Sequence, residues 1–514
     1  MANHPDQVAF FVGEVLERTS RKYAEKVALI FRNEKLTFAS LNERVNHLAS
    51  HLQHEGVKRG DRVALFLPNS LAFALSYYAT QRAGAVTVVL DARLKGKELL
   101  GVLKDADLRL LITHARLKPE VEEVFAELKR IPMWVVEGEG EERFEKKLST
   151  RAGDFSPPKL KAEDDAIILY TSGTTGEPKG VVLDHINLAQ FPVCMKAICH
   201  TGPDEVLGCI LPMSHISGPI QCNEIIDKGG TLVIFDQMNP VTLLEGIQAH
   251  RVTIFHAVPI VFQLLLGVPT LKDYDTRSVQ VAAMMGTTIP VSLMQAFKSA
   301  QAHVKVIQGY GLTETSPLIT FTELDKADAK MASMGRAVPD VEIKIVNPND
   351  EEVPQGEPGE IITRGPHLMK GYFRKPQATA ERIRGGWLYT GDIGRRDGDG
   401  YYYHLGRKDD MIITGGLNVY PTEVENMLCE FPHVQEAVVF PIPHAKRGSV
   451  IGAAVVLRPG SATTEKELLT FLRGNLANFK VPHRIAIHQS LPRTAVGKVI
   501  RDPALLLSEG GAEE

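Results

Sequence analysis

Apolar positions in the N-terminal part of the chain follow two spacings. In residues 12–23 and 38–56 they return every three or four positions, which predicts two amphipathic helices, the second ending at Gly56. The segments that follow alternate between short apolar runs, typical of buried strands, and longer helical patterns. They are 62–68 (strand), 70–84 (helix), 86–90 (strand), 98–107 (helix) and 109–114 (strand). This alternation predicts βαβ units and a parallel sheet.

The pattern divides the rest of the chain into three parts. Strand, helix and strand follow one another again between residues 230 and 258. From about Val341 the chain changes to short strands and turns with little helix. After Arg407 helices return, which predicts a separate small domain. We therefore expect an α/β fold: a large N-terminal domain of packed α/β sheets, a β-rich subdomain and a small C-terminal α/β domain.

Composition places the 514-residue chain among ordinary globular proteins and narrows its partners. Hydrophobic residues make up 44% and charged residues 23%, and the formal net charge is −4. No basic excess is available to attract nucleic acid. The apolar runs are far shorter than the roughly 20 residues of a membrane span, and no signal peptide is visible. Five scattered cysteines suit free thiols in a reducing compartment, so we expect a cytoplasmic protein.

The most informative segment is YTSGTTGEPKG, residues 170–180, directly after the apolar run AIIL. Glycines after a strand let backbone N–H groups converge on an anion, because glycine adopts the required backbone angles without steric cost. Hydroxyl side chains add donors, and Lys179 adds a positive charge. The spacing differs from the Walker A pattern. Taken alone, the segment fits either a loop that binds a triphosphate or a polar surface turn.

Five motifs in order along the chain resemble those of the adenylate-forming superfamily, which includes acyl- and aryl-CoA synthetases, peptide-synthetase adenylation domains and luciferases. Residues 170–180 are similar to its phosphate loop. The other motifs are GYGLTET (309–315), YTGDIG (389–394), GRKDDMIITGGLNVYPTEVE (406–425) and PRTAVGKVIR (492–501). They resemble the adenine and magnesium motif, the ribose motif, the hinge with its glycine loop, and the C-terminal lysine motif.

The resemblance implies an acid–thiol ligase. Such an enzyme activates a carboxylic acid with ATP to acyl-AMP and then forms a thioester with coenzyme A, releasing AMP and pyrophosphate. ATP, Mg²⁺ and coenzyme A are the implied cofactors. The implied domains are an adenylation domain (1–406), a hinge (407–410) centred on Asp409, and a mobile C-terminal domain (411–514). A homodimer is open as an alternative to a monomer.

The resemblance also implies a catalytic set. Glu314 and Thr171 are expected at Mg²⁺, because carboxylate and hydroxyl oxygens are hard ligands. Lys498 is expected to reach the reacting carboxylate and the α-phosphate, where an ammonium group offsets negative charge. Lys179 is expected as a second cation at the phosphates.

Two further residues are expected to hold the nucleoside. Tyr310 would lie against adenine, and the two oxygens of Asp392 would accept from the ribose hydroxyls. The remaining nucleotide-binding residues implied by the resemblance are Ser172, Gly173, Thr174, Thr175, Gly176, Gly286, Thr287, Thr288, Gly309, Gly311, Thr313 and Arg407.

Coenzyme A is expected at the C-terminal domain. The glycine loop, Gly415 and Gly416, would make room for the pantetheine arm after a rotation at the hinge. Phe479 and Lys480 resemble part of a second CoA-facing stretch. Arg447 stands where many CoA ligases have an aromatic residue, and arginine can stack on adenine or bind phosphate. The chain shows no carrier-protein serine motif, which favours free CoA over the alternative, an enzyme that loads a carrier protein.

The acyl pocket is expected beside the stretch LPMSHISG, residues 211–218. Met213 would line the pocket, and His215 would stand at its entrance. Gly311 occupies the position where acetate-specific members carry a tryptophan. We therefore expect an open pocket and no preference for acetate.

Two methionines distinguish this pocket from the pattern of the superfamily. Met284 and Met285 stand where relatives commonly have small residues. Two thioether side chains at the pocket floor would fill it with apolar bulk, which predicts a compact acid that is medium-chain, alicyclic or aromatic. A long-chain fatty acid is the alternative, because one methionine can point into the core instead.

Overall fold

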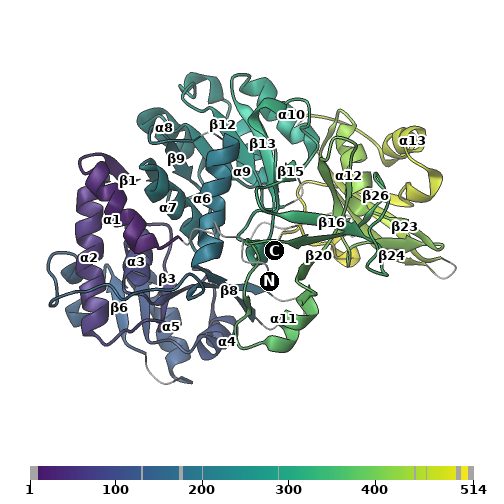
Figure 1. Cartoon of the computed structure of the whole chain (residues 1–514). Coiled ribbons are helices and arrows are strands. Elements are labelled where there is room, and N and C mark those ends of the chain that lie inside the picture. The colour runs from purple at the N-terminus through teal and green to yellow at the C-terminus, as the bar shows by residue number, and fades with distance from the viewer. Residues whose placement is uncertain are drawn as a thin grey trace.

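The computed structural model describes residues 10–128, 131–172, 178–199, 201–287, 289–444, 447–458, 460–493 and 499–507. Within them, two large sheets enclose a layer of helices, and a β-rich unit and a C-terminal lobe follow (Figure 1). The expected α/β fold is confirmed. In the described part of the chain, no helix has the length and apolar character needed to cross a membrane.

The first large sheet carries the glycine-rich segment. Its seven strands run in the order β18-β8-β7-β4-β3-β5-β6. Their bounds are β3 (Arg62–Phe66), β4 (Val86–Val89), β5 (Leu110–His114), β6 (Met133–Val136), β7 (Asp165–Ser172), β8 (Pro178–Asp184) and β18 (Gly371–Tyr372). Strands β3 to β7 are parallel, β8 returns antiparallel to β7, and β18 pairs antiparallel with β8. A short segment from far along the chain is thereby brought to the edge beside β8.

The second large sheet has nine strands in the order β15-β14-β13-β12-β11-β9-β10-β1-β2. Their bounds are β1 (Val27–Phe31), β2 (Glu34–Thr37), β9 (Val206–Cys209), β10 (Thr231–Ile234), β11 (Ile254–Ala257), β12 (Val281–Met284), β13 (Lys305–Tyr310), β14 (Thr320–Phe321) and β15 (Arg336–Ala337). Strands β1 and β9 to β13 are parallel. Their carboxyl ends therefore share one edge, where α/β sheets usually bind ligands.

Helices form three layers around these sheets. The central layer between the sheets consists of α1 (Val12–Lys22), α2 (Phe38–His54), α3 (Leu71–Arg82), α6 (His185–Cys199) and α7 (Ser217–Lys228). One outer layer, α8 (Pro240–His250), α9 (Pro259–Leu266) and α10 (Val291–Ala300), covers the nine-stranded sheet. The other, α4 (Gly96–Ala106) and α5 (Lys118–Phe125), covers the seven-stranded sheet. Every residue of α3 is buried, as expected for a helix enclosed on all sides.

The β-rich unit brings the predicted ribose residue to its partner. It contains β16 (Glu342–Val346), β17 (Gly359–Arg364), α11 (Pro376–Arg382), β19 (Ile383–Arg384), β20 (Trp387–Arg396) and β21 (Tyr402–Arg407). Strands β20 and β21 pair antiparallel, and Asp392 lies opposite Arg407 in their register. This register places the two side chains next to one another.

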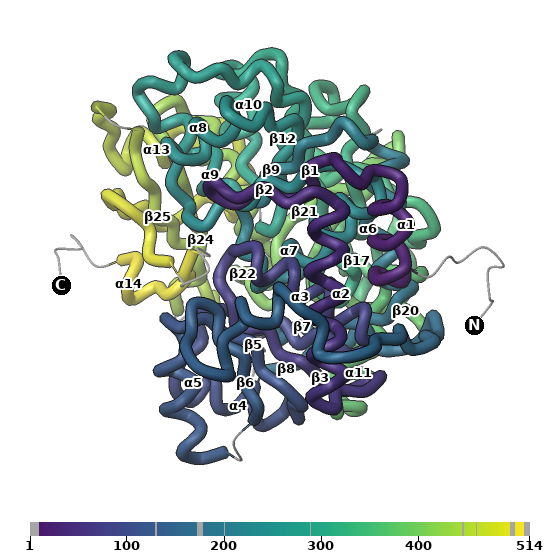
Figure 2. Tube along the Cα trace, turned by 90° about the vertical axis from the view of Figure 1, so that its left-hand side faces the viewer, coloured from purple at the N-terminus to yellow at the C-terminus, as the bar shows by residue number. Residues whose placement is uncertain are grey.

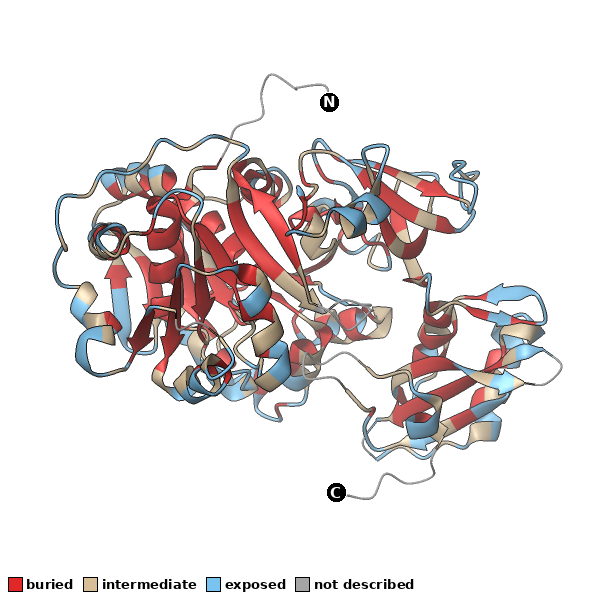
Figure 3. Cartoon of the chain, turned by 90° about the horizontal axis from the view of Figure 1, so that it is seen from below, coloured by how far each residue is buried: buried red, intermediate tan, exposed pale blue. Residues whose placement is uncertain are grey.

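The C-terminal lobe has a sheet and a core of its own. It contains β22 (Ile412–Thr414), β23 (Leu417–Val419), α12 (Pro421–Glu430), β24 (Val434–His444), β25 (Gly448–Leu457), α13 (Glu465–Asn475), β26 (Arg484–His488) and α14 (Pro503–Leu507). Its buried residues form clusters separate from those of the large sheets (Figure 3). The lobe lies on the opposite side of the molecule from α1 (Figure 2). The domain boundaries given for the sequence stay predictions.

Candidate active site

The glycine-rich segment connects two strands at the edge of the seven-stranded sheet. Thr171 near the end of β7 lies opposite Lys179 near the start of β8, and the Thr171 hydroxyl donates to the Lys179 carbonyl oxygen at 3.4 Å. Gly173, Thr174, Thr175 and Gly176 lie outside the described residues, as does the side chain of Ser172. The described residues on either side of the segment form the antiparallel pair β7 and β8.

Tyr372, which the sequence analysis missed, connects Glu314 to Lys179 of this segment. The Tyr372 hydroxyl donates to Glu314 Oε1 at 2.8 Å, and Lys179 Nζ lies 5.5 Å from the centre of the Tyr372 ring. The Met369 N–H also donates to the Glu314 carbonyl oxygen, at 2.9 Å. Tyr372 therefore joins the predicted metal ligand to the predicted phosphate cation.

The chemistry of this cluster suits a hydrated divalent cation. Burial, and then the Glu314 charge, raise the pKa of Tyr372, so its hydroxyl stays protonated and donates. The bond from Tyr372 engages one oxygen of Glu314 and leaves capacity on the other. Mg²⁺ commonly binds one or two carboxylates together with phosphates and water. Among the described residues, no group of three or more His, Cys, Asp and Glu side chains forms a metal site, so Glu314 would share the cation with the nucleotide.

Asp392 is the centre of a second cluster. Its side chain is 3% exposed; Oδ2 accepts from the Tyr310 hydroxyl at 2.6 Å, and Oδ1 accepts from Arg407 Nη1 at 3.0 Å. His404 Nε2, a contact that sequence reasoning missed, lies 3.5 Å from Oδ1. Burial raises the pKa of Asp392, but His404, Arg407 and Tyr310 outweigh it and hold that pKa below its usual value. Asp392 is therefore an ionised, oriented acceptor.

The glycines near these clusters lie where side chains would not fit. A Cβ built at Gly309 would approach the Phe321 ring to 2.5 Å. At Gly311 it would fall 1.6 Å from the Pro317 carbonyl oxygen, so a side chain there requires a different backbone. Gly311 therefore marks a close backbone approach, in addition to the open pocket expected from its lack of a side chain.

The segment after β12 is open to the site. Gly286 has a φ of 90° and is exposed, as is Thr287, whereas Thr288 lies outside the described residues. Thr313 begins the 3₁₀ turn Thr313–Thr315 that holds Glu314. These placements agree with a nucleotide that lies between β13 and the segment after β12.

At the predicted acyl entrance, His215 is exposed and its Nε2 lies 3.5 Å from Asp91 Oδ2. Arg93 also binds Asp91, and together with His215 it outweighs the effect of burial and holds the pKa of Asp91 well below its usual range. Met213 is buried in the core that contains the central helices, where its N–H donates to Asn69 Oδ1 at 2.6 Å. The sequence analysis did not identify this anchoring of the 211–218 stretch.

The expectation that both methionines line the pocket was wrong for Met284. Met284 is completely buried in the core beneath α8, α9 and α10, on the outer side of the sheet. Met285 is partly buried and packs against the core of the central layer. Successive residues of a strand point to opposite faces, and both faces of this sheet are covered, so only Met285 can contribute bulk on the central side.

The predicted hinge follows β21 directly. The Lys408 N–H donates to the Gly391 carbonyl oxygen at 2.8 Å, and Lys408 Nζ donates to Glu360 Oε2 at 2.8 Å. Arg501 of the C-terminal lysine motif lies 3.6 Å from Asp410, next to Asp409. Lys498 itself lies outside the described residues.

The predicted CoA residues are only partly brought together. Gly415 and Gly416, with φ of 57° and 83°, form the exposed tip between β22 and β23, and the Gly415 N–H donates to the Arg447 carbonyl oxygen at 3.1 Å. Phe479 packs against the core of the lobe. Lys480 is held by both oxygens of Glu423 at 2.6 and 2.7 Å, so its ammonium group already has a partner.

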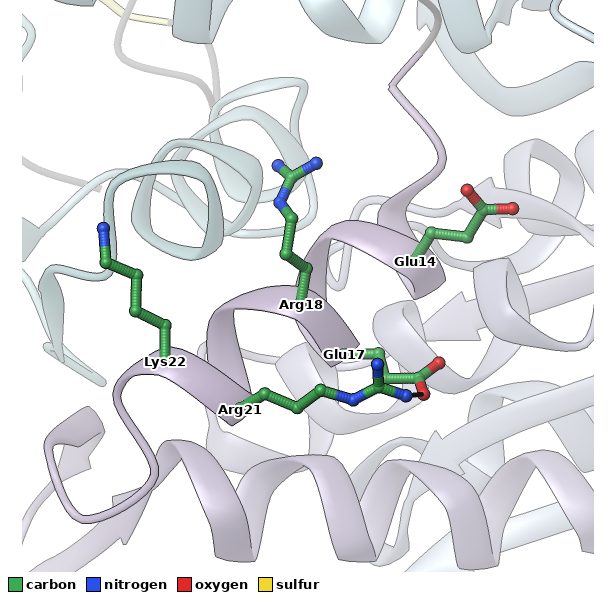
Figure 4. Close-up of a pocket in the computed structure, with 5 residues that line it drawn as sticks. All are labelled: Glu14, Glu17, Arg18, Arg21 and Lys22. Carbon is green, nitrogen blue, oxygen red and sulfur yellow. Dashed lines mark hydrogen bonds and ion pairs between the residues drawn. The ribbon is translucent and has the colours of Figure 1, made fainter.

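A surface recess elsewhere does not belong to this constellation. It lies along α1, and all the residues that border it belong to that helix (Figures 1 and 4). Its charges are mixed, and Arg21 pairs with Glu17 one helical turn away. The residues that border it are Glu14, Glu17, Arg18, Arg21 and Lys22.

Comparison with known families matches two models to the chain. The model described as AMP-binding enzyme covers residues 16–373, and that described as AMP-binding enzyme C-terminal domain covers residues 423–498. The first match alone spans more than half of the chain. The second lies within the C-terminal lobe, beginning after the glycine loop and ending within the C-terminal lysine motif.

Curated relatives match over nearly their whole length. A feruloyl-CoA synthase of Amycolatopsis sp is 35% identical over 492 residues, which is 94% of this chain and 96% of the relative. A long-chain-fatty-acid–CoA ligase of Bacillus subtilis is 33% identical, covering 95% and 92%. An indoleacetate–CoA ligase of Aromatoleum aromaticum is 32% identical, covering 96% and 97%.

Solved structures agree with the fold. The anthranilate CoA ligase AuaEII in complex with anthranoyl-AMP superposes with a TM-score of 0.89 at 26% identity, covering 96% of each chain. ATP-bound MatB from Rhodopseudomonas palustris gives a TM-score of 0.88 at 30% identity, covering 96% of this chain and 98% of that one.

Proposed function

The chain belongs to the family of AMP-binding enzymes, and from this we propose which residues perform each step and which acid it takes. The protein is an AMP-forming acid–thiol ligase, an acyl-CoA synthetase. It activates a carboxylic acid with ATP to acyl-AMP, releasing pyrophosphate, and then transfers the acyl group to coenzyme A, releasing AMP. It uses ATP, Mg²⁺ and coenzyme A.

The triphosphate is held between the connection of β7 to β8 and the cluster around Glu314. The observation that carries this assignment is the contact of Tyr372 with both Glu314 and Lys179. It places a carboxylate and an ammonium group together, as an anionic ligand with its cation requires. When bound, Mg²⁺ neutralises phosphate charge. Thr171 at the end of β7 supplies a hydroxyl on the same side of the connection.

The nucleoside lies against the cluster around Asp392. An ionised carboxylate offers about four acceptor positions, and its contacts with Tyr310, Arg407 and His404 leave an acceptor position for a ribose hydroxyl. The bond to Asp392 fixes the orientation of the Tyr310 ring, which costs little entropy when adenine stacks on it. Positioning and charge neutralisation are most of what nucleotidyl transfer asks of a protein.

Lys498 supplies the mobile cation at the α-phosphate during adenylation. It then leaves when the C-terminal domain (411–514) rotates against the adenylation domain (1–406) about Asp409. The rotation brings the tip with Gly415 and Gly416 to the acyl-adenylate. The exposure of this tip supports the assignment, because an exposed hairpin can enter another site, and a Cβ built at Gly415 or Gly416 meets no atom within 4 Å.

The acid is compact and aromatic. Met285 provides apolar bulk on the central side of the sheet. Two relatives, 35% and 32% identical to this chain, are named for the aromatic acids ferulate and indoleacetate. A long-chain fatty acid is the second candidate. The placement of Met284 in the outer core favours it, since only one of the two methionines then shortens the pocket.

Two experiments test this function. Acid-dependent exchange of pyrophosphate into ATP should appear with aromatic acids, and AMP release should require coenzyme A. A panel from four-carbon to sixteen-carbon acids, with benzoate and cinnamate, separates the two acid classes. Highest activity with the sixteen-carbon acid would contradict the compact pocket, and exchange with none of the acids would contradict the function.

The cytoplasmic location and the assembly state are also proposals. The five cysteines are all free and buried, which fits a reducing compartment. A homodimer stays a prediction that gel filtration with light scattering would test.

A further inference from the structure

The inner face of α7 carries a buried polar side chain that has no hydrogen-bond partner among the described residues. Gln221 is completely buried, and neither its amide nitrogen nor its amide oxygen makes a hydrogen bond within the described part of the chain. Buried polar groups nearly always have partners, because an unpaired one costs about 1–3 kcal/mol. The two free groups of one amide are therefore unusual enough to require a ligand, a water or a function.

His256 on β11 presents a second group of the same kind. It is completely buried, and both ring nitrogens lack a hydrogen-bond partner among the described residues. Its ring packs against Phe191 of α6 at 5.8 Å between centres. Burial lowers the pKa of His256, so the ring is neutral and offers one donor and one acceptor.

Both groups face the central layer close to the predicted acyl pocket. His256 lies opposite Ala283 in the register of β11 and β12, and Met285 follows Ala283 on the same face two residues later. Two residues advance a strand by about 6.6 Å. Gln221 lies four residues into α7, which begins at Ser217, two residues after His215. Glu224 and Lys228, three and seven residues after Gln221 on the same face of α7, act electrostatically on His256, so this face of α7 lies towards β11.

The charged residues near His256 do not satisfy these groups. Lys228 of α7 binds Glu224 and, at 3.4 Å, Glu205, so these three side chains pair with one another. The set holds two carboxylates and one ammonium group, and the charges of Glu224 and Lys228 act on His256. Because Lys228 is already paired with Glu224, it is not available as a cation to a ligand group that carried a negative charge.

We propose that Gln221 and His256 bind a neutral hydroxyl group at the far end of the acid, so that the preferred substrates are hydroxylated aromatic acids. A hydroxyl group both donates and accepts, as do an amide and a neutral imidazole. A second carboxylate at that end is disfavoured, because the ammonium group of Lys228 is already paired with Glu224. This inference rests on the proposed function, because it assumes that an aromatic acid occupies the space between α7 and Met285.

A ratio of two acids tests the proposal without depending on how much enzyme is active. Pyrophosphate exchange is measured with cinnamate and 4-hydroxycinnamate, and with benzoate and 4-hydroxybenzoate. We expect kcat/KM to favour the hydroxylated member of at least one pair by about tenfold or more, because a site built to bind a hydroxyl rejects the analogue without it. Q221M, which keeps an unbranched side chain of similar length, should reduce that ratio to within about threefold.

Asn223 provides the matched control on the same helix. It is equally buried, but it lies two residues away, about 200° around the helix. Its Oδ1 accepts from the Tyr77 hydroxyl at 2.9 Å, and only its Nδ2 lacks a partner among the described residues. N223L should lower the melting temperature and leave the ratio of the two acids unchanged. If Q221M folds poorly, H256F supplies the same comparison, since the ratio is independent of the active fraction.

Each outcome separates the proposals. Equal activity with both members of each pair in the wild type, or an equal change of ratio in Q221M and N223L, overturns the hydroxyl site. If Q221M has a higher melting temperature and an unchanged ratio of the two acids, a buried water is the partner of the Gln221 amide. That result also overturns the hydroxyl site. Exchange only with fatty acids contradicts the aromatic substrate and the hydroxyl site together, while adenylation itself stands.

Discussion

The two sides of the site treat their polar groups differently. On the nucleotide side, around Glu314 and Asp392, each carboxylate already holds a tyrosine hydroxyl at 2.6–2.8 Å. On the acyl side, around Gln221 and His256, the buried amide and imidazole have no partner within the described residues. Side chains that are oriented before binding lower the entropic cost of binding ATP, which is the same ligand in every turnover. Unpaired groups instead select between acids, because the wrong acid leaves them unsatisfied.

The largest effect should come from the charge at Glu314. E314Q keeps the size of the side chain but cannot neutralise a divalent cation. We expect acid-dependent exchange to fall by about 100-fold or more, as when a preorganised electrostatic contact is removed. The control is E342Q, because Glu342 pairs with Arg364 on an exposed part of the β-rich unit and should tolerate the change. If E314Q supported pyrophosphate exchange at the wild-type rate when Mg²⁺ is limiting, Glu314 would not be a ligand of the metal.

Tyr372 tests whether the nucleotide side is oriented before binding. Y372F removes the bond to Glu314 but keeps the ring against Lys179. One lost hydrogen bond to a charged group is worth about 1.5–3 kcal/mol, so the Mg²⁺ concentration for half-maximal activity should rise by about tenfold or more. The KM for the acid should stay unchanged, which a general loss of structure would not produce.

The matched control for Tyr372 is Tyr403, whose hydroxyl donates to Asp397 at 2.9 Å in the hairpin between β20 and β21. Y403F should cost similar stability and leave the Mg²⁺ dependence as it is. Identical Mg²⁺ curves for Y372F and the wild type would show that the tyrosine only fills space.

Sequence reasoning located the residues that lie within motifs but not those that support them. Glu314, Tyr310, Asp392 and Arg407 are identified by motifs that resemble those of the superfamily, and the structure brings them into the two clusters of the nucleotide side. Tyr372 lies in the two-residue strand β18, which reaches the site only by pairing with β8. No local pattern encodes a pairing between segments so far apart along the chain.

The residues of the acyl side were also difficult to assign from sequence, because both faces of a parallel sheet are buried. Both sides of the nine-stranded sheet are covered by helices, so its strands are apolar at consecutive positions and the pattern does not reveal which residue points to which side. Met284 was expected in the pocket because it stands where relatives commonly have small residues, and the apolar pattern gave no sign that it faces the outer side. Gln221 and His256 were missed because a single polar residue in an apolar segment gives no sign of its partners.

A moderate effect should come from Met285, the methionine on the central side. M285A removes apolar bulk near the far end of the acid, so longer acids should gain relative to compact ones. We expect the ratio of kcat/KM for dodecanoate over benzoate to rise about fivefold, on the scale of a few methylenes in a hydrophobic pocket. An unchanged ratio would show that Met285 packs only against the core.

A smaller effect concerns stability beside the acyl side. Burial, and then the Glu224 charge, raise the pKa of Glu205 to about 8. An acid with a raised pKa in the folded state binds its proton more tightly when folded, so its contribution to stability is lost as pH rises from about 4.5 to about 8. E205Q imitates the protonated form and should remove this loss.

The measurement for Glu205 is the difference in melting temperature between E205Q and the wild type at several pH values. The variant should gain relative to the wild type between pH 5 and pH 8 and level off above that. The catalytic preference between acids should not change. A difference that stays constant with pH would show that the Glu205–Lys228–Glu224 set carries no shared proton.

The smallest effect is expected at Met284, and it completes the comparison with Met285. The side chain lies in the core beneath α8, α9 and α10, with the sheet between it and the acyl side. M284L nearly conserves volume, so it should lower the free energy of unfolding by less than about 1.5 kcal/mol. The dodecanoate-to-benzoate ratio should stay within about twofold of the wild type, since no atom facing the acid is altered. A shift in that ratio as large as the one in M285A would show that the two faces of the sheet are coupled through β12, and the acyl side would then extend into the outer core.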